Sequence, residues 1–478
     1  MDLQNYIDGK FSNQSSKKWL INQEPATGEV ICRIPISNEN DVLKAVNAAK
    51  KAQPEWGRLT HKERAKWLDK IADKLEEWHE EIAELESRDT GKPISLSRTV
   101  DATRSVSNFR FFAKTIREVE VETFEMEDAT NYVIRNPVGV GALITPWNLP
   151  LYLLSWKVAP AIGMGNTVVC KPSELTPMTA DLLMRAIDSV GLPSGVVNLV
   201  HGNGIETGGP LVESLGIDFV SFTGGTLTGA KVAASAAPSF KKLSLELGGK
   251  NSSIIFADCE IEKTVSGVVK SGFMNQGQIC LCGSRIFIEE TIYNKFKNKL
   301  IDKVESMKIG NPLEEDTELG ALISKEHLEK VQYYVNLAIE EGGTLLTGGF
   351  PCLPTNLEGG NWMSPVVIDD LSHDSRCSTE EIFGPLVTLH KFNNEEDLVK
   401  MVNNTRYGLA GSIWTEDLEK GRRVAGSIHT GMIWINTWLH RDLRVPFGGV
   451  KDSGVGREGG RWSLNFFSEA MNICIKHD

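Results

Sequence analysis

The chain has 478 residues, of which 41% are hydrophobic and 24% charged, which is ordinary for a globular protein of about three domains. Its 51 Lys and Arg are outnumbered by 63 Asp and Glu, giving a formal charge of -12, and no basic block resembles a nucleic-acid footprint. Met1 to Phe11 lacks the basic start and apolar core of a signal peptide, and no run of about 18 apolar residues occurs. We therefore expect a cytoplasmic protein without nucleic-acid or membrane partners.

Eight cysteines are scattered along the chain, and without a secretory signal they favour free thiols over a disulfide framework. Cys280 and Cys282 form a Cys-x-Cys pair, but no second pair of Cys or His lies at the spacing of a zinc site. We expect no metal. For Cys282 the composition of the segment favours a small, buried, apolar side chain.

The predicted elements begin with an amphipathic helix over residues 61–90, where apolar residues recur at steps of three and four until Gly91 and Pro93. Beyond it, short runs of β-forming residues alternate with helical stretches such as 177–190, and these runs cover 138–144, 167–170 and 196–200. The alternation predicts βαβ units in a doubly wound parallel sheet of an α/β protein.

A strand, a glycine turn and a helix are predicted over 219–234. The amide groups at the start of such a helix can receive a pyrophosphate. An earlier glycine-rich run, 201–208, misses the spacing of the common dinucleotide fingerprint by one residue, and a turn explains its glycines without a cofactor.

Two side chains suggest chemistry. Leu243, Leu245 and Leu247 alternate with Glu246, so a strand here places the leucines on one face and the carboxylate on the other. Cys280 lies further along, and a thiol with a carboxylate supplies a nucleophile and a base for water. Taken alone, Glu246 also fits an ordinary solvated strand position.

A series of motifs runs in order along nearly the whole chain: Pro-Trp-Asn-Leu-Pro (146–150), Lys-Pro-Ser-Glu (171–174), Phe-Thr-Gly-Gly-Thr (222–226), Glu-Ile-Phe-Gly-Pro (381–385) and Pro-Phe-Gly-Gly-Val-Lys-Asp-Ser-Gly (446–454). With them the chain resembles the aldehyde dehydrogenase superfamily. That resemblance implies an α/β fold of three parts and assembly as a homodimer or homotetramer. The parts are a Rossmann-like NAD-binding domain (1–117 and 137–247), an α/β catalytic domain (248–447, with 448–463 returning to the cofactor domain) and a small β bridging arm (118–136 and 464–478).

The resemblance also implies catalytic roles. Cys280 attacks an aldehyde, and the side-chain amide of Asn148 with the backbone N–H of Cys280 meets the oxyanion. After hydride transfer to the nicotinamide, Glu246 activates the water that hydrolyses the thioester. Lys157 and Glu458 match a proton relay of relatives, and a structural ion pair explains them about as well.

The implied cofactor is NAD. A carboxylate at Glu174 binds ribose hydroxyls and repels a 2′-phosphate, although Glu is also stabilising at an exposed helix start. Gly225 stands where many members have Ser. The implied cofactor-binding residues are Ile144, Thr145, Pro146, Trp147, Lys171, Glu174, Gly204, Gly208, Phe222, Thr223, Gly224, Gly225, Gly229, Leu247, Gly248, Glu381 and Phe383.

Within the superfamily, segments 104–113, 146–157 and 438–444 are similar to the subgroup that oxidises 2-aminomuconic and 2-hydroxymuconic semialdehydes. In that subgroup Arg104 and Arg441 match a pair that binds the substrate carboxylate, since a guanidinium pairs with a carboxylate through two parallel hydrogen bonds. Ordinary surface arginines are the competing interpretation, and the role of Arg444 is open. The implied substrate residues are Arg104, Asn148, Tyr152, Trp156, Arg441 and Phe447, with Asn148 also near the 2-amino or 2-hydroxy group.

Two further functions stay open from the sequence. Tyr152, Trp156, Trp438 and Phe447 are able to line an apolar tunnel for broad or retinal-type aldehyde oxidation, or simply to pack in a core. A catalytically silent binding or structural protein is the alternative of another class. The joint presence of Cys280, Glu246 and Asn148 argues against it.

Overall fold

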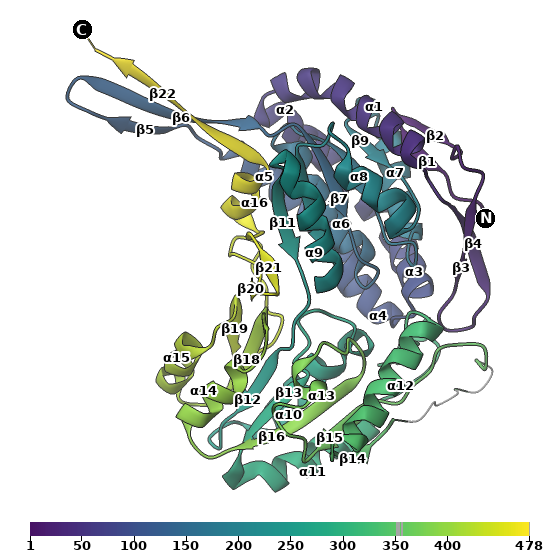
Figure 1. Ribbon diagram of the computed structural model, residues 1–478, viewed down its shortest axis with the longest axis vertical. Coiled ribbons are helices and arrows are strands. Elements are labelled where there is room, and N and C mark those ends of the chain that lie inside the picture. Colours follow the sequence, from purple (N-terminus) through teal and green to yellow (C-terminus); the bar gives the residue numbers. More distant parts are fainter. Residues whose placement is uncertain (350–353, 355–356, 478) are drawn as a thin grey trace.

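The computed structural model describes residues 1–349, 354 and 357–477. Two large sheets follow one another along the long axis of the molecule, and a narrow arm projects from one end (Figure 1). The chain passes from the first sheet to the second directly after Glu246. The site predicted around Glu246 and Cys280 therefore falls where the two sheets meet.

The first sheet has eight strands in the order β2-β1-β9-β8-β7-β10-β11-β21. Its five central strands are parallel, and most of their residues are buried, as expected for a sheet covered on both faces. This confirms the predicted doubly wound sheet. The strands are β1 (Asn5–Ile7), β2 (Lys10–Ser12), β7 (Val140–Ile144), β8 (Thr167–Lys171), β9 (Val197–Leu199), β10 (Phe219–Thr223), β11 (Lys242–Glu246) and β21 (Gly454–Val455).

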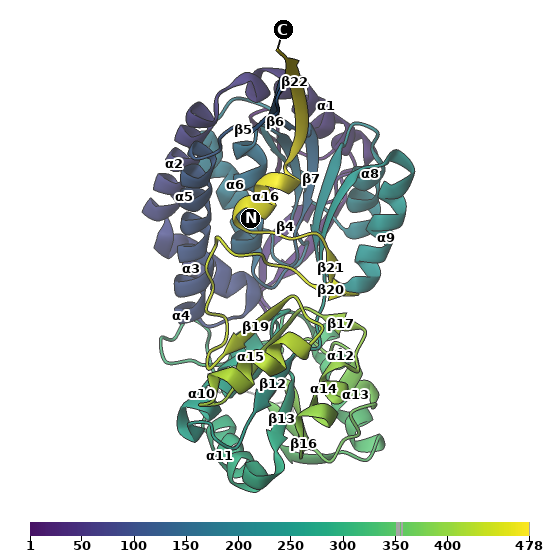
Figure 2. The same ribbon diagram turned by 90° about the vertical axis from the view of Figure 1, so that its left-hand side faces the viewer.

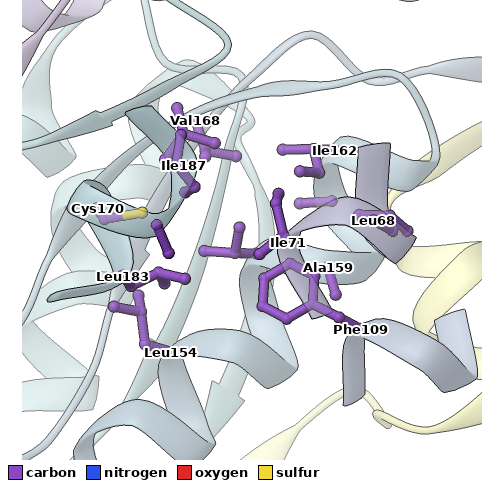
Figure 3. Close-up of a cluster of buried hydrophobic side chains, with 14 of the residues drawn as sticks. Leu68, Ile71, Phe109, Leu154, Ala159, Ile162, Val168, Cys170, Leu183 and Ile187 are labelled. Carbon is purple, nitrogen blue, oxygen red and sulfur yellow. The ribbon is translucent and has the colours of Figure 1, made fainter. Parts of the chain in front are cut away.

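Helices cover both faces of this sheet. One face packs against α1 (Glu39–Arg58), α8 (Gly209–Glu213) and α9 (Thr226–Ala236). The other packs against α2 (His61–Glu77), α5 (Thr103–Arg117), α6 (Pro150–Gly163) and α7 (Met178–Ser189). Figure 3 shows this second core, in which Leu68, Phe109, Leu154 and Leu183 converge.

The prediction of a single helix over 61–90 is wrong, because Trp78 interrupts it and separates α2 from α3 (His79–Thr90). Trp78 has φ -96° and ψ 18°, outside the helical region. The two halves have different partners: α2 packs along α5, whereas α3 packs along α7 and the segment after Gly91. Periodicity alone does not reveal such a change of direction. Gly91 does end the second helix, with a left-handed φ of 76°.

After Gly91 the chain forms α4 (Ile94–Leu96) and a π-helical turn, η1 (Ser97–Ala102), which runs directly into α5. Single π-turns inside helices are uncommon and occur often at functional sites. This one lies two residues before Arg104.

The second sheet has seven strands in the order β14-β15-β16-β13-β12-β18-β19, all parallel except β14. They are β12 (Ser252–Ile255), β13 (Arg285–Glu289), β14 (Thr344–Thr347), β15 (Val366–Asp369), β16 (Leu386–Phe392), β18 (Ala410–Trp414) and β19 (Met432–Ile435). Its helices are α10 (Ile261–Phe273), α11 (Tyr293–Glu305), α12 (Lys325–Glu340), α13 (Arg376–Thr379), α14 (Glu395–Asn403) and α15 (Leu418–Ser427). Cys280 follows α10 on the way to β13.

The arm is a three-stranded antiparallel sheet of β5 (Glu122–Glu125), β6 (Ala129–Pro137) and β22 (Ser468–Lys476). β22 pairs along all of β6, from Ser468 opposite Pro137 to Lys476 opposite Ala129. β22 lies at the edge of this sheet, and Figures 1 and 2 show the strand extending away from the body. Smaller elements are β3 (Trp19–Gln23), β4 (Val30–Pro35), β17 (Tyr407–Gly408), β20 (Val450–Lys451) and α16 (Gly460–Phe466). Within the described ranges no helix has the length and apolar character that a membrane crossing requires.

Candidate active site

The loop that carries Cys280 has an unusual backbone. Asn275, Gln276 and Gly277 all have left-handed φ values, 53°, 55° and 70°, and such a conformation is unfavourable for residues other than glycine. A side chain at position 277 would place its Cβ 2.2 Å from the carbonyl oxygen of Gly384. The loop is therefore a strained left-handed turn that packs against the segment before β16. It places the thiol at the junction of the two sheets.

Asn251 secures the far side of this loop. Its Nδ2 donates to the carbonyl oxygens of Cys280 (2.7 Å) and Cys282 (3.0 Å), while its Oδ1 accepts from the backbone N–H of Ala410. All the polar atoms of this buried side chain are thus used to hold the nucleophile loop. Sequence reasoning missed Asn251, and its position just before a buried strand was the one available signal.

Asn148 lies at the start of α6 and is 4% exposed. Its Nδ2 donates to the backbone carbonyl oxygen of Gln278 (2.8 Å), and the backbone carbonyl oxygen of Asn148 accepts from Nδ2 of Asn275 (3.1 Å). A side-chain amide has two N–H groups, so one remains for another acceptor. Asn148 is therefore fixed to the Cys280 loop with one donor to spare, as an oxyanion donor requires.

Glu246 is the last residue of β11 and is 4% exposed, and neither carboxyl oxygen has a hydrogen-bond partner among the described residues. Burial raises the pKa of Glu246 well above its ordinary value, and the nearby charge of Glu458 raises it further, against smaller opposite effects of Lys157 and two arginines. A Cβ at Gly448 would lie 2.6 Å from its Oε1. The carboxyl group therefore holds its proton to a higher pH than it would in water, and it is a stronger base once it loses that proton.

Lys157 and Glu458 form a buried ion pair behind Glu246. Nζ of Lys157 lies 2.8 Å from Oε1 of Glu458, and the side chains are 1% and 6% exposed. The same Nζ donates to Oγ of Ser221 (2.9 Å), in the strand beside Glu246. The sequence did not single out Ser221. This geometry fits a proton relay and a structural pair equally.

Cys280 is half-buried. Burial raises the pKa of the Cys280 thiol, and the negative groups of Glu381 and Glu246 raise it further, whereas Arg441 lowers it. The resting sulfur therefore carries a proton and needs a base before it attacks. Cys282 is 6% exposed in an apolar cluster, which confirms its expected packing role.

The start of α9 presents free backbone amides to an open space. Gly225 precedes its first turn with no side-chain cap, and a Cβ at Gly225 would meet nothing within 4 Å. At Gly229 a Cβ would lie 2.4 Å from Cδ2 of Leu247, so the glycine lets the helix pack closely on the end of β11. An uncapped helix start of this kind is suited to a phosphate.

Two buried hydroxyl groups lie at the same edge of the first sheet. Within the part of the chain that the structure describes, Oγ1 of Thr145 and Oγ1 of Thr223 have no hydrogen-bond partner. Thr145 directly follows β7, and Thr223 ends the paired strand β10. Dinucleotides bind at this carboxyl edge in open α/β sheets. Buried hydroxyls seldom stay unpaired, so this edge fits a polar ligand. Ile144 ends β7, Pro146 follows Thr145, and Phe222 lies in β10 with its ring against Gly224.

Lys171 ends the neighbouring strand β8. Its Nζ donates to the carbonyl oxygen of Pro172 (3.0 Å) and to Oε2 of Glu174 (3.4 Å), and burial lowers its pKa. The Glu174 side chain is 34% exposed, at the rim of the same edge. Gly208 packs near the Lys171 side chain, and Gly204 faces open space in a short π-helical turn.

Glu381 and Phe383 reach this edge from the second sheet. Oε1 of Glu381 accepts from the backbone N–H of Gly249 (2.9 Å), and burial raises the pKa of its carboxyl group. A Cβ at Gly248 would lie 2.2 Å from Oε2, so only glycine admits the carboxylate. The ring of Phe383 meets Trp147 edge-on, with centroids 5.2 Å apart. The predicted cofactor residues thus come together from both sheets.

Arg441 lies in an aromatic cage. Its Nη1 donates to the hydroxyl oxygen of Tyr152, and its guanidinium carbon lies 4.4 Å from the ring centroid of Trp156 and 4.2 Å from that of Phe447. Its Nη2 is buried and has no hydrogen-bond partner in residues 1–349, 354 and 357–477. No carboxylate among the described residues forms an ion pair with it. The cage thus orients a cation and leaves one donor group unused.

Arg104 is half-buried on the first turn of α5, and within the described part of the chain it makes no hydrogen bond, ion pair or ring contact. The residues four positions before and after Arg104 both contact the region of Tyr152. Val100 packs in the apolar cluster that contains Tyr152, and Nδ2 of Asn108 donates to the backbone carbonyl oxygen of Tyr152 (3.1 Å). Arg104 therefore belongs to the wall next to the Arg441 cage.

Arg444 has a different environment. Its guanidinium forms a two-pronged pair with Asp442, and its side chain is 80% exposed. His440 is also exposed, and its carbonyl oxygen accepts from Trp434. Of the two arginines in this loop, only Arg441 faces the interior cluster.

Comparison with known proteins assigns the class. The aldehyde dehydrogenase family model matches residues 11–473, and the chain belongs to this family. It is 45% identical over 480 residues to human 2-aminomuconic semialdehyde dehydrogenase, covering 99% of this chain and 98% of that protein. To 2-hydroxymuconic semialdehyde dehydrogenase of Pseudomonas sp. (strain CF600) it is 42% identical, covering 99% of each. Betaine aldehyde dehydrogenase of Staphylococcus aureus, solved in complex with NAD+, has a TM-score of 0.97 at 36% identity, covering 99% of this chain and 95% of that chain.

Proposed function

We propose that the protein is an NAD-dependent aldehyde dehydrogenase that oxidises a semialdehyde with a distal carboxylate, such as 2-aminomuconate or 2-hydroxymuconate 6-semialdehyde, to the dicarboxylic acid. The observation that carries the choice of substrate is the caged Arg441, whose Nη2 is buried without a partner. The muconic semialdehyde dehydrogenases that the chain resembles support the same choice.

The proposed cofactor site uses groups that this structure leaves without partners. The first amides of α9 would hold the pyrophosphate, the hydroxyls of Thr145 and Thr223 offer unused donors, and Glu174 disfavours a 2′-phosphate. Glu381, fixed by the N–H of Gly249, would bind ribose hydroxyls. When bound, NAD supplies the acceptor for the aldehyde hydride.

Glu246 and Cys280 carry out the proton transfers of the proposed reaction. Deprotonated Glu246 takes the Cys280 proton, the sulfur bonds to the aldehyde carbon, and the spare N–H of Asn148 meets the oxyanion. After oxidation the acyl group remains on sulfur as a thioester. Glu246 then takes a proton from the attacking water, the carbon–sulfur bond breaks, and the acid leaves while the thiol regains its proton. Between these two steps Glu246 releases the first proton, and we assign its transfer to Lys157 and Glu458.

The proposed acid clamp consists of Arg441 and Arg104. A substrate carboxylate pairs with the unused donors of both guanidinium groups, in a site where burial strengthens the attraction. An apolar aldehyde gains nothing from these cations and meets an aromatic cage already filled by Arg441. This argues against retinal-type oxidation.

Arginine variants test the clamp. Arg441→Met and Arg104→Met each remove a charged hydrogen-bond donor, which corresponds to a loss of about 10- to 100-fold in kcat/KM for a semialdehyde acid. Arg444→Met is the matched control, because Arg444 lies in the same loop but pairs with Asp442. If all three variants behave alike, or if a neutral aldehyde suffers the same loss, the clamp is wrong.

We propose that residues 118–136 and 464–478 form a bridging arm that joins subunits as a homodimer or homotetramer, attached to an NAD-binding domain (1–117 and 137–247) and a catalytic domain (248–447). The support is a set of exposed apolar side chains on the arm: Val121, Phe124, Met126, Met471, Ile473 and Ile475. Sedimentation of a chain ending at Ser468 should show an assembly of fewer subunits than the full chain forms, and an unchanged number of subunits contradicts the proposal.

The free cysteines of the described residues support a cytoplasmic location.

A further inference from the structure

Three fully buried charged side chains join α3 to the π-helical turn that precedes Arg104. Nζ of Lys92 is 2.7 Å from Oδ2 of Asp101 and 3.7 Å from Oε2 of Glu86, and all three side chains are 0% exposed. None of them takes part in the proposed chemistry. Removing three charges from water is expensive, and apolar residues of similar volume often stabilise a core as well or better. This triad therefore calls for a role other than stability.

One end of the triad holds the helix that carries Tyr152. Oε1 of Glu86 accepts from the backbone N–H of Leu151 (2.9 Å), in the first turn of α6, and from the hydroxyl of Thr179 (2.7 Å). Leu151 directly precedes Tyr152, whose hydroxyl accepts from Arg441. Glu86 thus fixes the wall on which the Arg441 cage is built.

The other end holds the turn that leads to Arg104. Asp101 lies in the π-helical turn η1, three residues before Arg104. A π-turn contains one residue more than an α-turn, and one residue corresponds to about 100° of rotation about the helix axis. The direction in which Arg104 leaves α5 thus depends on whether this turn is kept.

We propose that Lys92 is a positioning residue for substrate recognition, which joins Glu86 to Asp101 and so fixes the π-turn that aims Arg104 at the Arg441 cage. This inference deepens the proposed function and rests on it. Lys92 touches neither the substrate nor the cofactor, and it acts through the geometry of the two arginines.

The test is a substrate pair measured on two variants. Lys92→Met combined with Asp101→Asn removes both partners of the short ion pair but also takes from Glu86 its cation. Asp101→Asn alone is the milder change, because Lys92 still faces Glu86. The matched control is Lys241→Met, since Lys241 is another buried lysine, bonded to backbone carbonyl oxygens far from the clamp. Each protein is assayed with a semialdehyde acid and with its methyl ester.

We expect both Asp101 variants to raise KM for the acid about tenfold, with kcat and the ester parameters unchanged, because one charged hydrogen bond is misdirected. In a protein that already carries Arg104→Met, the same changes should not raise KM for the acid further, because Lys92 and Asp101 act through Arg104. Lys241→Met should not separate the two substrates.

Two outcomes distinguish failure of the positioning role of Lys92 from failure of the arginine clamp. If Arg104→Met selectively weakens the acid but the Lys92 and Asp101 variants affect acid and ester alike, or neither, the positioning role is overturned and the clamp stands. If Arg104→Met itself fails to separate acid from ester, the clamp has failed and the positioning role falls with it. Should the double variant not fold, Asp101→Asn decides by the same criteria.

Discussion

The two ends of the active site treat charge in opposite ways. At the catalytic end, burial raises the pKa of Cys280 and of Glu246, so each group holds its proton to a higher pH than it would in water. At the recognition end, Arg441 and Arg104 are cations without a carboxylate partner among the described residues. Catalysis here needs protons that can move, whereas recognition needs a charge that does not change, and guanidinium supplies it.

The largest effect is expected at the nucleophile. Cys280→Ala should lower kcat by about 10⁴-fold or more, because the variant lacks the sulfur that forms the thioester, while NAD still binds by calorimetry. Cys282→Ala is the control and should retain activity, since Cys282 is buried in an apolar cluster. Full activity in Cys280→Ala shows that the wrong thiol was assigned.

Glu246→Gln should uncouple the two halves of the reaction. We expect one burst of reduced cofactor and then a steady rate lower by about 10²- to 10⁴-fold, because the water attacking the thioester lacks its base. Mass spectrometry of the intact protein should then detect an acyl adduct. Steady turnover without an adduct assigns the base role to another residue.

The same carboxyl group sets the pH dependence of the unmodified protein. The pKa of Glu246 is raised, and only its deprotonated form is a base, so hydrolysis should increase as the pH rises through that value. Deacylation measured in single-turnover experiments from pH 6 to about 9 checks this. A deacylation rate independent of pH contradicts the assignment.

Asn148 should have an intermediate effect. Asn148→Ala removes the spare N–H beside the Cys280 loop, and loss of one oxyanion donor lowers kcat by about 10²- to 10³-fold with little change in KM. A rise in KM alone indicates that Asn148 binds substrate instead. Steady-state kinetics on one semialdehyde separates these results.

The smallest effect concerns stability. A buried carboxyl with a raised pKa stays protonated in the folded protein at a pH where the unfolded chain has released its proton, so folding loses stability as the pH rises. Glu246→Gln should avoid this loss and raise the melting temperature by roughly 2 °C at pH 9, with less gain at pH 6. Equal gains at both pH values contradict the pKa assignment.

Local patterns in the sequence predicted a large part of this structure. The parallel sheet and the turn before α9 follow from short-range periodicity and glycine placement. The approach of Glu246, Cys280 and Asn148 was expected only from the family motifs, because no local rule brings distant segments together. The motifs likewise singled out Arg104 and Arg441.

Features that depend on long-range packing were not predicted. The helix break at Trp78 reflects two different neighbours of α2 and α3. The left-handed turn at Asn275 and Gln276 holds only because bonds from Gln276 reach carbonyl oxygens of two distant segments. The pairing of Arg444 with Asp442, which leaves Arg441 to the cage, likewise became visible only in three dimensions.

One measurement tests the central claim most directly: kcat/KM of the unmodified protein for a semialdehyde acid compared with its methyl ester, at saturating NAD. Two unpaired arginines predict that the acid is preferred by about 100-fold or more. Equal values for acid and ester, or faster oxidation of the ester, contradict recognition of a distal carboxylate.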